Sequence, residues 1–341
     1  MTELLCSRSP VTNPLLEVDN LSVCFDTGEE TLEAIDNISF TIKAGETVGL
    51  VGESGCGKSV TAHAIMRLLP QPLGRISEGS IKFNGVNLST LSLTNLEDIR
   101  GSNIGMIFQE PMTALNPVQT IGKQISESLI LHLNLSIPKA LQTSIEILRR
   151  VGIPSPELKV SEYPHQLSGG MLQRVVIAIA LSCKPLLLIA DEPTTALDVT
   201  IQAQILDLIQ SLQYEMKMAT LLITHDLGIV AETCDRVLIM YAGRIVESGA
   251  VADIFDNPSH PYTQGLINSI PRLTTPSKSR LPVIRGQVPL IKDYPKACRF
   301  ENRCAHRINK CSELSPKLEK ISKSHQVSCF AWKNIQLSRS I

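Results

Sequence analysis

No stretch of the sequence is long and apolar enough to cross a membrane. The most apolar region, residues 175–190, is interrupted by Lys184 and Pro185. It falls short of the roughly 20 apolar residues that a membrane-spanning helix needs. The N-terminus lacks a basic start followed by an apolar run, so we expect no secretion signal. Any contact with a membrane is therefore expected to come through a partner protein.

The chain also lacks an excess of positive charge. Lys and Arg total 32 against 33 Asp and Glu, a formal net charge of -1. A dedicated nucleic-acid-binding protein usually carries a strongly positive field, so no nucleic acid is expected as a partner. The nine cysteines are odd in number and unevenly spread, unlike a secreted disulfide framework. This usage favours a reducing cytosol.

The apolar patterns predict an α/β protein. With 341 residues and 43% hydrophobic composition, the chain can bury a substantial core. Alternation predicts antiparallel strands at residues 15–25 and 38–42, and apolar runs predict buried strands at 47–51, 106–108, 186–190, 221–224 and 236–241. Apolar residues recur with helical spacing at residues 61–69 and 119–151, and again from Met171 onward. This order predicts a parallel sheet covered on both faces, with a mostly helical insertion at about 111–184.

A glycine-rich motif follows the predicted strand at 47–51. It satisfies G-x-x-x-x-G-K-[ST] between a strand and a helix, a context that argues against a chance turn. Its residues are Gly52, Glu53, Ser54, Gly55, Cys56, Gly57, Lys58 and Ser59. Backbone N–H groups and the helix N-terminus would hold phosphates, and Lys58 would reach the terminal phosphates. We interpret the segment as a phosphate-binding loop in which the Ser59 hydroxyl holds Mg²⁺.

Two adjacent carboxylates end the predicted strand at 186–190. Burying the two charges of Asp191 and Glu192 there would cost free energy unless one carboxylate bound a metal ion and the other a water molecule. Asp191 suits Mg²⁺ and Glu192 suits the attacking water. The alternative is an acidic turn that caps a helix before Pro193. The phosphate-binding loop upstream favours the metal-and-water interpretation.

Two further segments carry weaker signals. Ser168, Gly169 and Gly170 begin a helix, where glycines let the backbone approach an anion, although a capped helix start has the same pattern. Cys56 lies at a helix N-terminus, which lowers the pKa of a thiol and predicts a reactive cysteine that ATP would protect. The alternative for Cys56 is a small residue tolerated at a variable motif position.

The order of these motifs resembles the ATP-binding-cassette (ABC) family over roughly residues 14–255. The matching elements are the phosphate-binding loop, Gln109, the Leu-Ser-Gly-Gly segment, Asp191-Glu192, Ala196-Leu197-Asp198 and His225. The resemblance implies a P-loop NTPase with a RecA-like parallel sheet, an antiparallel β subdomain and a helical subdomain. It also implies that Phe25 stacks on adenine, although a strand Phe is more often a core residue.

The resemblance further assigns roles around the nucleotide. It implies that Gln109 contacts Mg²⁺ and senses the transmembrane partner, that His225 contacts the γ-phosphate, and that Asp198 forms the D-loop. With Lys58 and Glu192, His225 would complete the catalytic set. In this family residues 168–170 face the phosphate-binding loop of the opposite subunit. Dimerisation would thus be part of catalysis.

Residues 256–341 form a proline-rich, loop-rich extension. Its segment Ser-His-Pro-Tyr-Thr-Gln-Gly-Leu at 259–266, followed by Ile-Pro-Arg-Leu at 270–273, resembles the oligopeptide/dipeptide/nickel branch of ABC ATPases, as does the segment at 108–117. Leu172 departs from the branch, which usually has a basic residue there. The resemblance implies a second, different ATPase chain, two transmembrane permease subunits and an external substrate-binding protein. It places the chain peripherally at the cytoplasmic face of a bacterial inner membrane, importing di- or oligopeptides, with nickel as the alternative cargo.

Four cysteines near the C-terminus have the spacing C-x5-C-x6-C-x17-C: Cys298, Cys304, Cys311 and Cys329. Four thiolates suit Zn²⁺ or a [4Fe–4S] cluster. The resemblance implies the iron–sulfur cluster, and free buried thiols are the alternative.

A soluble ABC ATPase acting on nucleic acid or ribosomes would share the nucleotide motifs. Such proteins usually join two cassettes or insert a coiled coil, and this chain has neither a second phosphate-binding loop nor sustained heptads.

Overall fold

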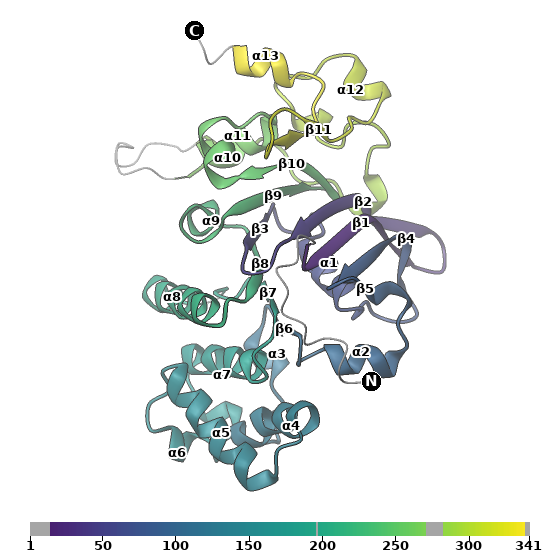
Figure 1. Cartoon of the computed structure of the whole chain (residues 1–341). Coiled ribbons are helices and arrows are strands. Elements are labelled where there is room, and N and C mark those ends of the chain that lie inside the picture. Colours follow the sequence, from purple (N-terminus) through teal and green to yellow (C-terminus); the bar gives the residue numbers. More distant parts are fainter. Residues whose placement is uncertain (1–13, 196, 271–281, 338–341) are drawn as a thin grey trace.

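The computed structural model describes residues 14–195, 197–270 and 282–337 (Figure 1). Ala196 and the prolyl segment at 271–273, both part of the sequence motifs, lie outside the described residues. None of the helices in the described ranges combines the length and the apolar character that a membrane crossing requires.

A four-stranded antiparallel sheet forms one layer. Its order is β2 (Thr31–Ile42), β1 (Leu16–Asp26), β4 (Gly74–Phe83) and β5 (Val86–Asn87). The predicted antiparallel strands are confirmed, but β2 begins at Thr31, well before the predicted start at residue 38. Asn37 adopts a left-handed φ of 50°, which interrupts the alternation of apolar and polar residues that strand prediction relies on.

The larger sheet has eight strands. Their order is β11 (Glu319–Lys320), β12 (Gln326–Val327), β10 (Arg244–Ala250), β9 (Arg236–Tyr241), β3 (Thr47–Val51), β8 (Ala219–Thr224), β7 (Leu187–Asp191) and β6 (Ile104–Ile107). Neighbours from β9 to β6 are parallel, as predicted. Because the carboxyl ends of parallel strands share one edge, the segments after β3, β6, β7 and β8 meet there.

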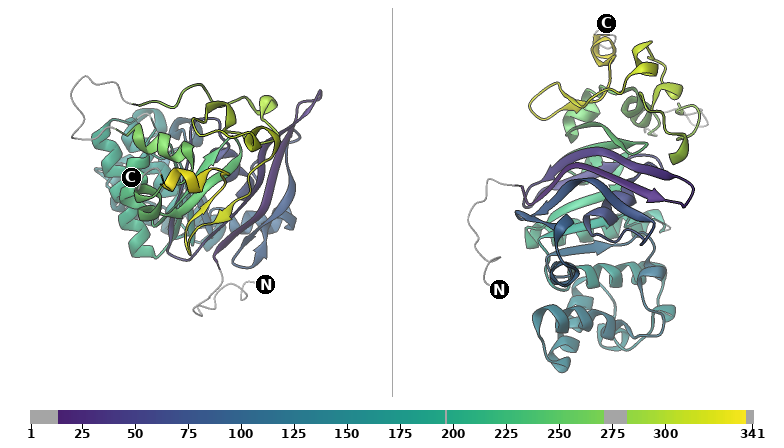
Figure 2. Two further views of the ribbon diagram at one scale, coloured as in Figure 1. Left: turned by 90° about the horizontal axis from the view of Figure 1, so that it is seen from above. Right: turned by 90° about the vertical axis from the view of Figure 1, so that its right-hand side faces the viewer.

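Helices fill the chain between β6 and β7. They are α3 (Pro111–Ala114), α4 (Ile121–Leu133), α5 (Ile137–Arg150), α6 (Pro156–Lys159) and α7 (Gly169–Leu181), with the 3₁₀ turn η2 (Pro164–Gln166). Apolar faces of α4, α5 and α7 join α8 (Val199–Met216) in one core with the adjoining strands. The right-hand view of Figure 2 places α4 to α6 as a separate layer below the sheets.

A second core lies between the two sheets and encloses α1 (Lys58–Ile65). The sequence predicts a helix through residue 69, but Arg67 adopts a left-handed φ of 50° and ends the helical geometry. The remaining elements of this part are α2 (Leu93–Ile99), α9 (Leu227–Thr233) and η1 (Leu88–Thr90).

The C-terminal extension packs against the large sheet and lengthens it. Its β12 pairs with β10, and Tyr262 and Phe300 are buried in a third core with β9. Figure 1 shows this part above β9 and β10. The helical elements that follow β10 are α10 (Val251–Asp256), which leads into the extension, and then α11 (Pro261–Asn268), η3 (Ile291–Asp293), η4 (Glu301–Arg303), α12 (Lys310–Glu313) and α13 (Trp332–Leu337).

Candidate nucleotide site

The phosphate-binding motif forms a tight loop between β3 and α1. Gly55 and Gly57 have φ angles of 79° and 109°, which side-chain-bearing residues rarely adopt. A Cβ at Gly52 would lie 2.2 Å from the carbonyl oxygen of Met240, so only glycine fits against β9. The sequence pattern therefore corresponds to a backbone shape that its glycines make possible.

Lys58 points back into this loop. Its Nζ donates hydrogen bonds to the carbonyl oxygens of Gly52 at 2.8 Å and Glu53 at 3.2 Å, and it lies 3.8 Å from Glu192 Oε1. The side chain is only 5% exposed. Its positive charge is thus already held at the centre of the loop, where phosphate oxygens would exchange with the carbonyl groups.

The carboxylates after β7 face the loop. The hydroxyl of Ser59 donates to Asp191 Oδ1 at 3.1 Å. Burial raises the pKa of Asp191, and the Ser59 hydrogen bond offsets this only in part. A buried carboxylate beside a hydroxyl is an oxygen donor set of the kind that Mg²⁺ prefers, so these residues fit the ion.

Glu192 is the centre of a second group of contacts. Its backbone has a left-handed φ of 47°, which is costly for a non-glycine residue and is typical of functional sites. Thr195 Oγ1 donates to Glu192 Oε2 at 2.9 Å, Gln109 Nε2 donates to the same oxygen at 3.2 Å, and His225 Nδ1 lies 3.4 Å from Oε1.

Burial alone would raise the pKa of Glu192. The hydrogen bond from Thr195 and the charges of Lys58 and His225 outweigh burial and leave this pKa lowered. Glu192 is therefore ionised at neutral pH and able to accept a hydrogen bond from water. The pKa values of the neighbouring carboxyls Asp191 and Glu192 are moved in opposite directions, which suits different roles.

Glu192, Gln109, His225 and the first residues of the loop border one cavity of about 480 Å³. Its lining residues are Gly52, Glu53, Ser54, Gln109, Glu192, His225 and Leu266. The parallel order of β3, β8, β7 and β6 brings the loop, Gln109, the two carboxylates and His225 together as the motifs predict.

Other predicted residues lie elsewhere in the single chain. Phe25 is half-buried in β1, where its ring lies over Gly74, and it is not among the described residues that line the cavity. Ser168 precedes α7, and the Asp198 side chain caps α8 by accepting from the Ile201 N–H at 3.0 Å. Neither belongs to the cavity lining given above.

The prediction of a reactive Cys56 is wrong. The side chain is fully buried in the core between the sheets, and burial raises the pKa of its thiol to about 11 despite the nearby Lys58 charge. The helix N-terminus argument fails because loss of hydration disfavours the thiolate more strongly. Only the backbone of Cys56 belongs to the phosphate-binding loop.

We therefore expect Cys56 in the folded protein to resist alkylation. Treatment with iodoacetamide at neutral pH, followed by peptide mass spectrometry, should modify Cys56 at least about 100-fold more slowly than in the unfolded chain, because the buried thiol is neither accessible nor ionised. ATP should not change the rate. Rapid modification that ATP prevents would contradict the buried position.

The four C-terminal cysteines approach one another without forming a recognisable metal site. Burial, with a smaller contribution from the neighbouring thiols, raises the pKa of Cys298 to about 11 and that of Cys329 to about 12. Cys298 donates its N–H to the Cys311 carbonyl oxygen at 3.1 Å. Within the described ranges, no group of three or more His, Cys, Asp or Glu side chains is arranged to hold a metal ion.

Three contacts of the site were not predicted from the sequence. Thr195 binds Glu192, whereas Tyr262 and Arg303 of the extension bind Glu53 of the loop. Tyr262 lies within the segment that suggested the family branch, but no local pattern indicates that its hydroxyl reaches a residue more than two hundred positions earlier.

Comparison with known proteins agrees with the family resemblance that the sequence motifs indicate. The family described as "ABC transporter" matches residues 35–195, and "Oligopeptide/dipeptide transporter, C-terminal region" matches residues 246–311. The chain is 49% identical to "Probable peptide ABC transporter ATP-binding protein y4tR" of Sinorhizobium fredii, over 94% of this chain and 96% of that protein. It is 50% identical to "Oligopeptide transport ATP-binding protein AppD" of Bacillus subtilis, over 93% and 97%.

A solved structure is also similar. It is described as "Dimeric structure of a post-hydrolysis state of the ATP-binding cassette MJ0796 bound to ADP and Pi". The TM-score is 0.63 at 28% sequence identity, and the match covers 69% of this chain and 98% of that one. The predicted fold class is confirmed.

Proposed function

The chain belongs to the ABC transporter ATP-binding family, and from this premise we propose that it powers peptide import by hydrolysing ATP. The observation that carries the proposal is the convergence on one glycine-rich loop of Lys58, Asp191 and Glu192. A binding module without hydrolysis would not need the carboxylate of Glu192 held beside Lys58.

The roles of the residues follow from their positions. Backbone N–H groups of the loop bind phosphate oxygens, and Lys58 compensates the charge that develops on them. Ser59, Asp191 and Gln109 would hold Mg²⁺. When bound, the ion neutralises phosphate charge. Glu192 orients the attacking water and accepts its proton. His225 lies next to Glu192, where it would contact the γ-phosphate that the water attacks.

We propose that the functional unit is a dimer of ATPase subunits. Ser168, Gly169 and Gly170 begin α7 outside the cavity of their own chain, so they are available to a second chain. Helix N-terminal N–H groups suit a phosphate. The similar solved structure is described as dimeric, which supports this arrangement. In the oligopeptide branch the partner would be a second, different ATPase chain, with Asp198 in the D-loop between them.

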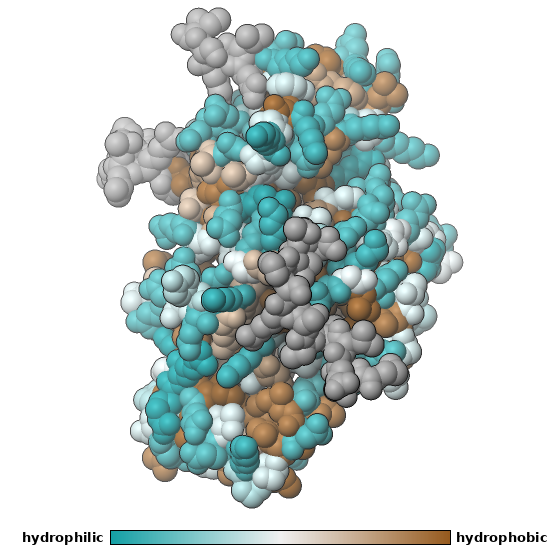
Figure 3. All heavy atoms as spheres, in the orientation of Figure 1, coloured by the Kyte–Doolittle hydropathy of each residue, from teal (hydrophilic) through white to brown (hydrophobic). Residues whose placement is uncertain are grey.

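We propose that the chain lies at the cytoplasmic face of a bacterial inner membrane, where it binds two permease subunits. Exposed apolar side chains gather on the helical layer, which forms the lower end of the molecule in Figure 3. They include Leu131, Ile137 and Leu158, which are 67%, 73% and 68% exposed. Apolar patches of this kind mark protein interfaces. An external binding protein would deliver the cargo.

Peptides are the proposed cargo because the extension matches the oligopeptide/dipeptide region and the relatives are named for peptide transport. Nickel import by the same branch is the second candidate. The two cargo proposals are distinguished by deleting the gene and measuring the uptake of labelled di- and oligopeptides and of nickel. Loss of peptide uptake alone supports the proposal, and loss of nickel uptake alone contradicts it.

We also propose that Cys298, Cys304, Cys311 and Cys329 bind a [4Fe–4S] cluster, with Zn²⁺ as the alternative. The support is the electrostatic influence of the neighbouring thiols on Cys298 and Cys329. The described residues are not arranged to hold a metal ion, so the four thiols would have to move closer together to bind one. Visible absorbance and metal analysis of anaerobically purified protein test this. Colourless, metal-free and active protein would remove the metal from the proposal.

A further inference from the structure

Glu53, the second residue of the phosphate-binding loop, is held by the C-terminal extension. Arg303 forms two parallel contacts with its carboxylate, Nη1 to Oε2 at 2.5 Å and Nη2 to Oε1 at 3.0 Å. Tyr262 Oη accepts the Glu53 backbone N–H at 2.9 Å. The Glu53 carbonyl oxygen accepts from Lys58. Both the backbone and the side chain of Glu53 are therefore restrained.

Arg303 is itself fixed in this position. Its side chain is only 6% exposed, and it donates to the carbonyl oxygens of Arg285 at 2.9 Å and Gly286 at 3.3 Å. The guanidinium also lies 5.6 Å from the ring centroid of Tyr241 and donates to its hydroxyl. An arginine held in this way provides a preorganised, bidentate partner for one carboxylate.

Tyr262 reaches the loop from a packed aromatic group. Its ring centroid lies 4.7 Å from that of Tyr241 and 5.5 Å from that of Phe300, and the residue is fully buried. Phe300 lies near Arg303 in the chain and also meets Tyr241 edge-on at 5.1 Å. One aromatic cluster thus supports both residues that bind Glu53.

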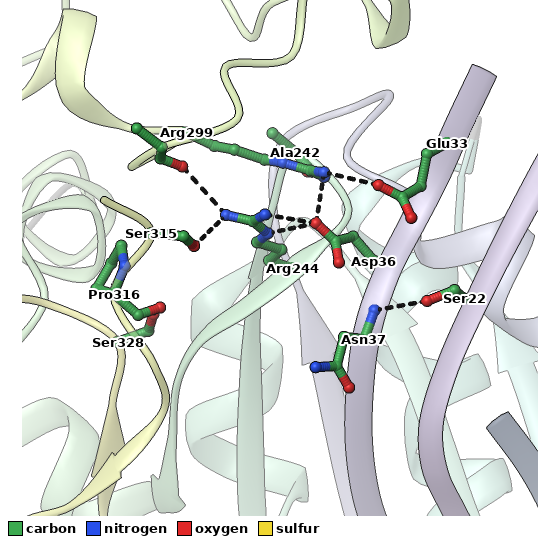
Figure 4. A network of polar contacts seen from close by, with 11 residues as sticks. Ser22, Glu33, Asp36, Asn37, Ala242, Arg244, Arg299, Ser315, Pro316 and Ser328 are labelled. Carbon is green, nitrogen blue, oxygen red and sulfur yellow. Dashed lines mark hydrogen bonds and ion pairs between the residues drawn. The ribbon is translucent and has the colours of Figure 1, made fainter. Parts of the chain in front are cut away.

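The segment that carries Arg303 is anchored a second time, on the antiparallel sheet. Figure 4 shows Arg244 and Arg299 pointing toward Asp36 of β2. Arg299 Nη2 lies 2.7 Å from Asp36 Oδ2, and Arg244 donates to the Ala297 carbonyl oxygen at 3.1 Å. Arg299 is buried, so this anchor is not a mobile surface contact.

We propose that Arg303 and Tyr262 are positioning residues for nucleotide binding. A carboxylate in a loop that receives a polyanion opposes binding unless its charge is neutralised, and Arg303 neutralises it. Tyr262 fixes the direction of the Glu53 peptide group. ATP affinity therefore depends on the docked extension. The inference rests on the proposed nucleotide binding by this loop.

The test is a double-mutant cycle between Arg303 and Glu53. The dissociation constant of a fluorescent ATP analogue is measured for each variant of the purified full-length chain. Arg303→Met should weaken binding about 10-fold, because the Glu53 charge is then uncompensated beside the phosphates. Glu53→Gln alone should shift binding in the opposite direction and tighten it, because a negative charge beside the phosphates is removed while Arg303 keeps its positive charge. The combined variant should bind within about threefold of wild type, because no uncompensated charge remains.

Two more variants complete the design. Tyr262→Phe keeps the ring but removes the hydroxyl, and should weaken binding about fivefold through the lost hydrogen bond. Arg307→Met is the matched control, since Arg307 is 60% exposed and pairs with Glu301 and not with Glu53. Thermal unfolding of each variant identifies any loss of folding.

The outcomes separate the possible failures. Rescue of Arg303→Met by Glu53→Gln supports the proposal, since repair of a merely structural defect would not depend on Glu53. Wild-type affinity in Arg303→Met, or a combined variant as weak as Arg303→Met, overturns it. Wild-type protein that fails to bind the ATP analogue would instead overturn the proposed nucleotide binding and this inference with it.

Discussion

Replacing Glu192 by Gln is expected to reduce ATP hydrolysis by about 100-fold to 10,000-fold, the usual contribution of a general base. Glutamine keeps the size of the side chain and can still accept the Thr195 hydrogen bond, but it cannot take a proton from water. The lowered pKa of Glu192 makes it an ionised acceptor at neutral pH, a state that glutamine cannot reproduce. ATP binding should be unchanged, and a closed dimer should accumulate.

The measurement is phosphate release by the assembled transporter, with ATP affinity determined separately. Glu215→Gln is the matched control, because Glu215 is 62% exposed and pairs with Arg150 at the surface. It should hydrolyse ATP at the wild-type rate. Normal turnover by Glu192→Gln would show that another group activates the water.

Replacing Lys58 by Met is expected to weaken ATP binding about 100-fold, because a desolvated positive charge that contacts phosphate oxygens is lost. Methionine keeps the apolar stem, so the buried path of the side chain remains filled. The contacts that Lys58 makes with Gly52 and Glu53 also disappear, which loosens the empty loop.

Titration with a fluorescent ATP analogue measures this effect, and thermal unfolding separates it from loss of folding. Lys139→Met is the control, since Lys139 is exposed on the helical layer and distant from the cavity residues in the chain. Affinity of Lys58→Met within about threefold of wild type would mean that the loop does not bind phosphate through this lysine.

The nucleotide site could be predicted largely because its parts follow parallel strands. Strand β3 leads into the glycine-rich loop, β7 ends at Asp191 and leads into Glu192, and β8 leads into His225. Adjacent parallel strands end at one edge of the sheet. Local patterns therefore identify the residues, and sheet topology brings them together. The shape of the loop also has a local signal, because glycine readily adopts the positive φ angles that the loop requires at Gly55 and Gly57.

Other features depend on packing that no local pattern reveals. Cys56 occupies a motif position that tolerates many residues, and only the fold shows its side chain buried between the sheets. The contact between Arg303 and Glu53 joins segments 250 residues apart, beside a core to which α11, β9 and Phe300 contribute. The pairing of these two opposite charges cannot be predicted from the sequence, because only the tertiary structure places the residues side by side.

We propose that each hydrolytic centre needs this loop together with the Ser168 helix start of a second subunit. ATP hydrolysis by the purified chain, measured at dilutions where sedimentation shows only monomer, tests it most directly against the assembled transporter. We expect the monomer to bind ATP but to release phosphate at least about 100-fold more slowly, because α7 of a partner is missing from the site. Hydrolysis by the monomer at the full rate of the assembly would contradict the claim.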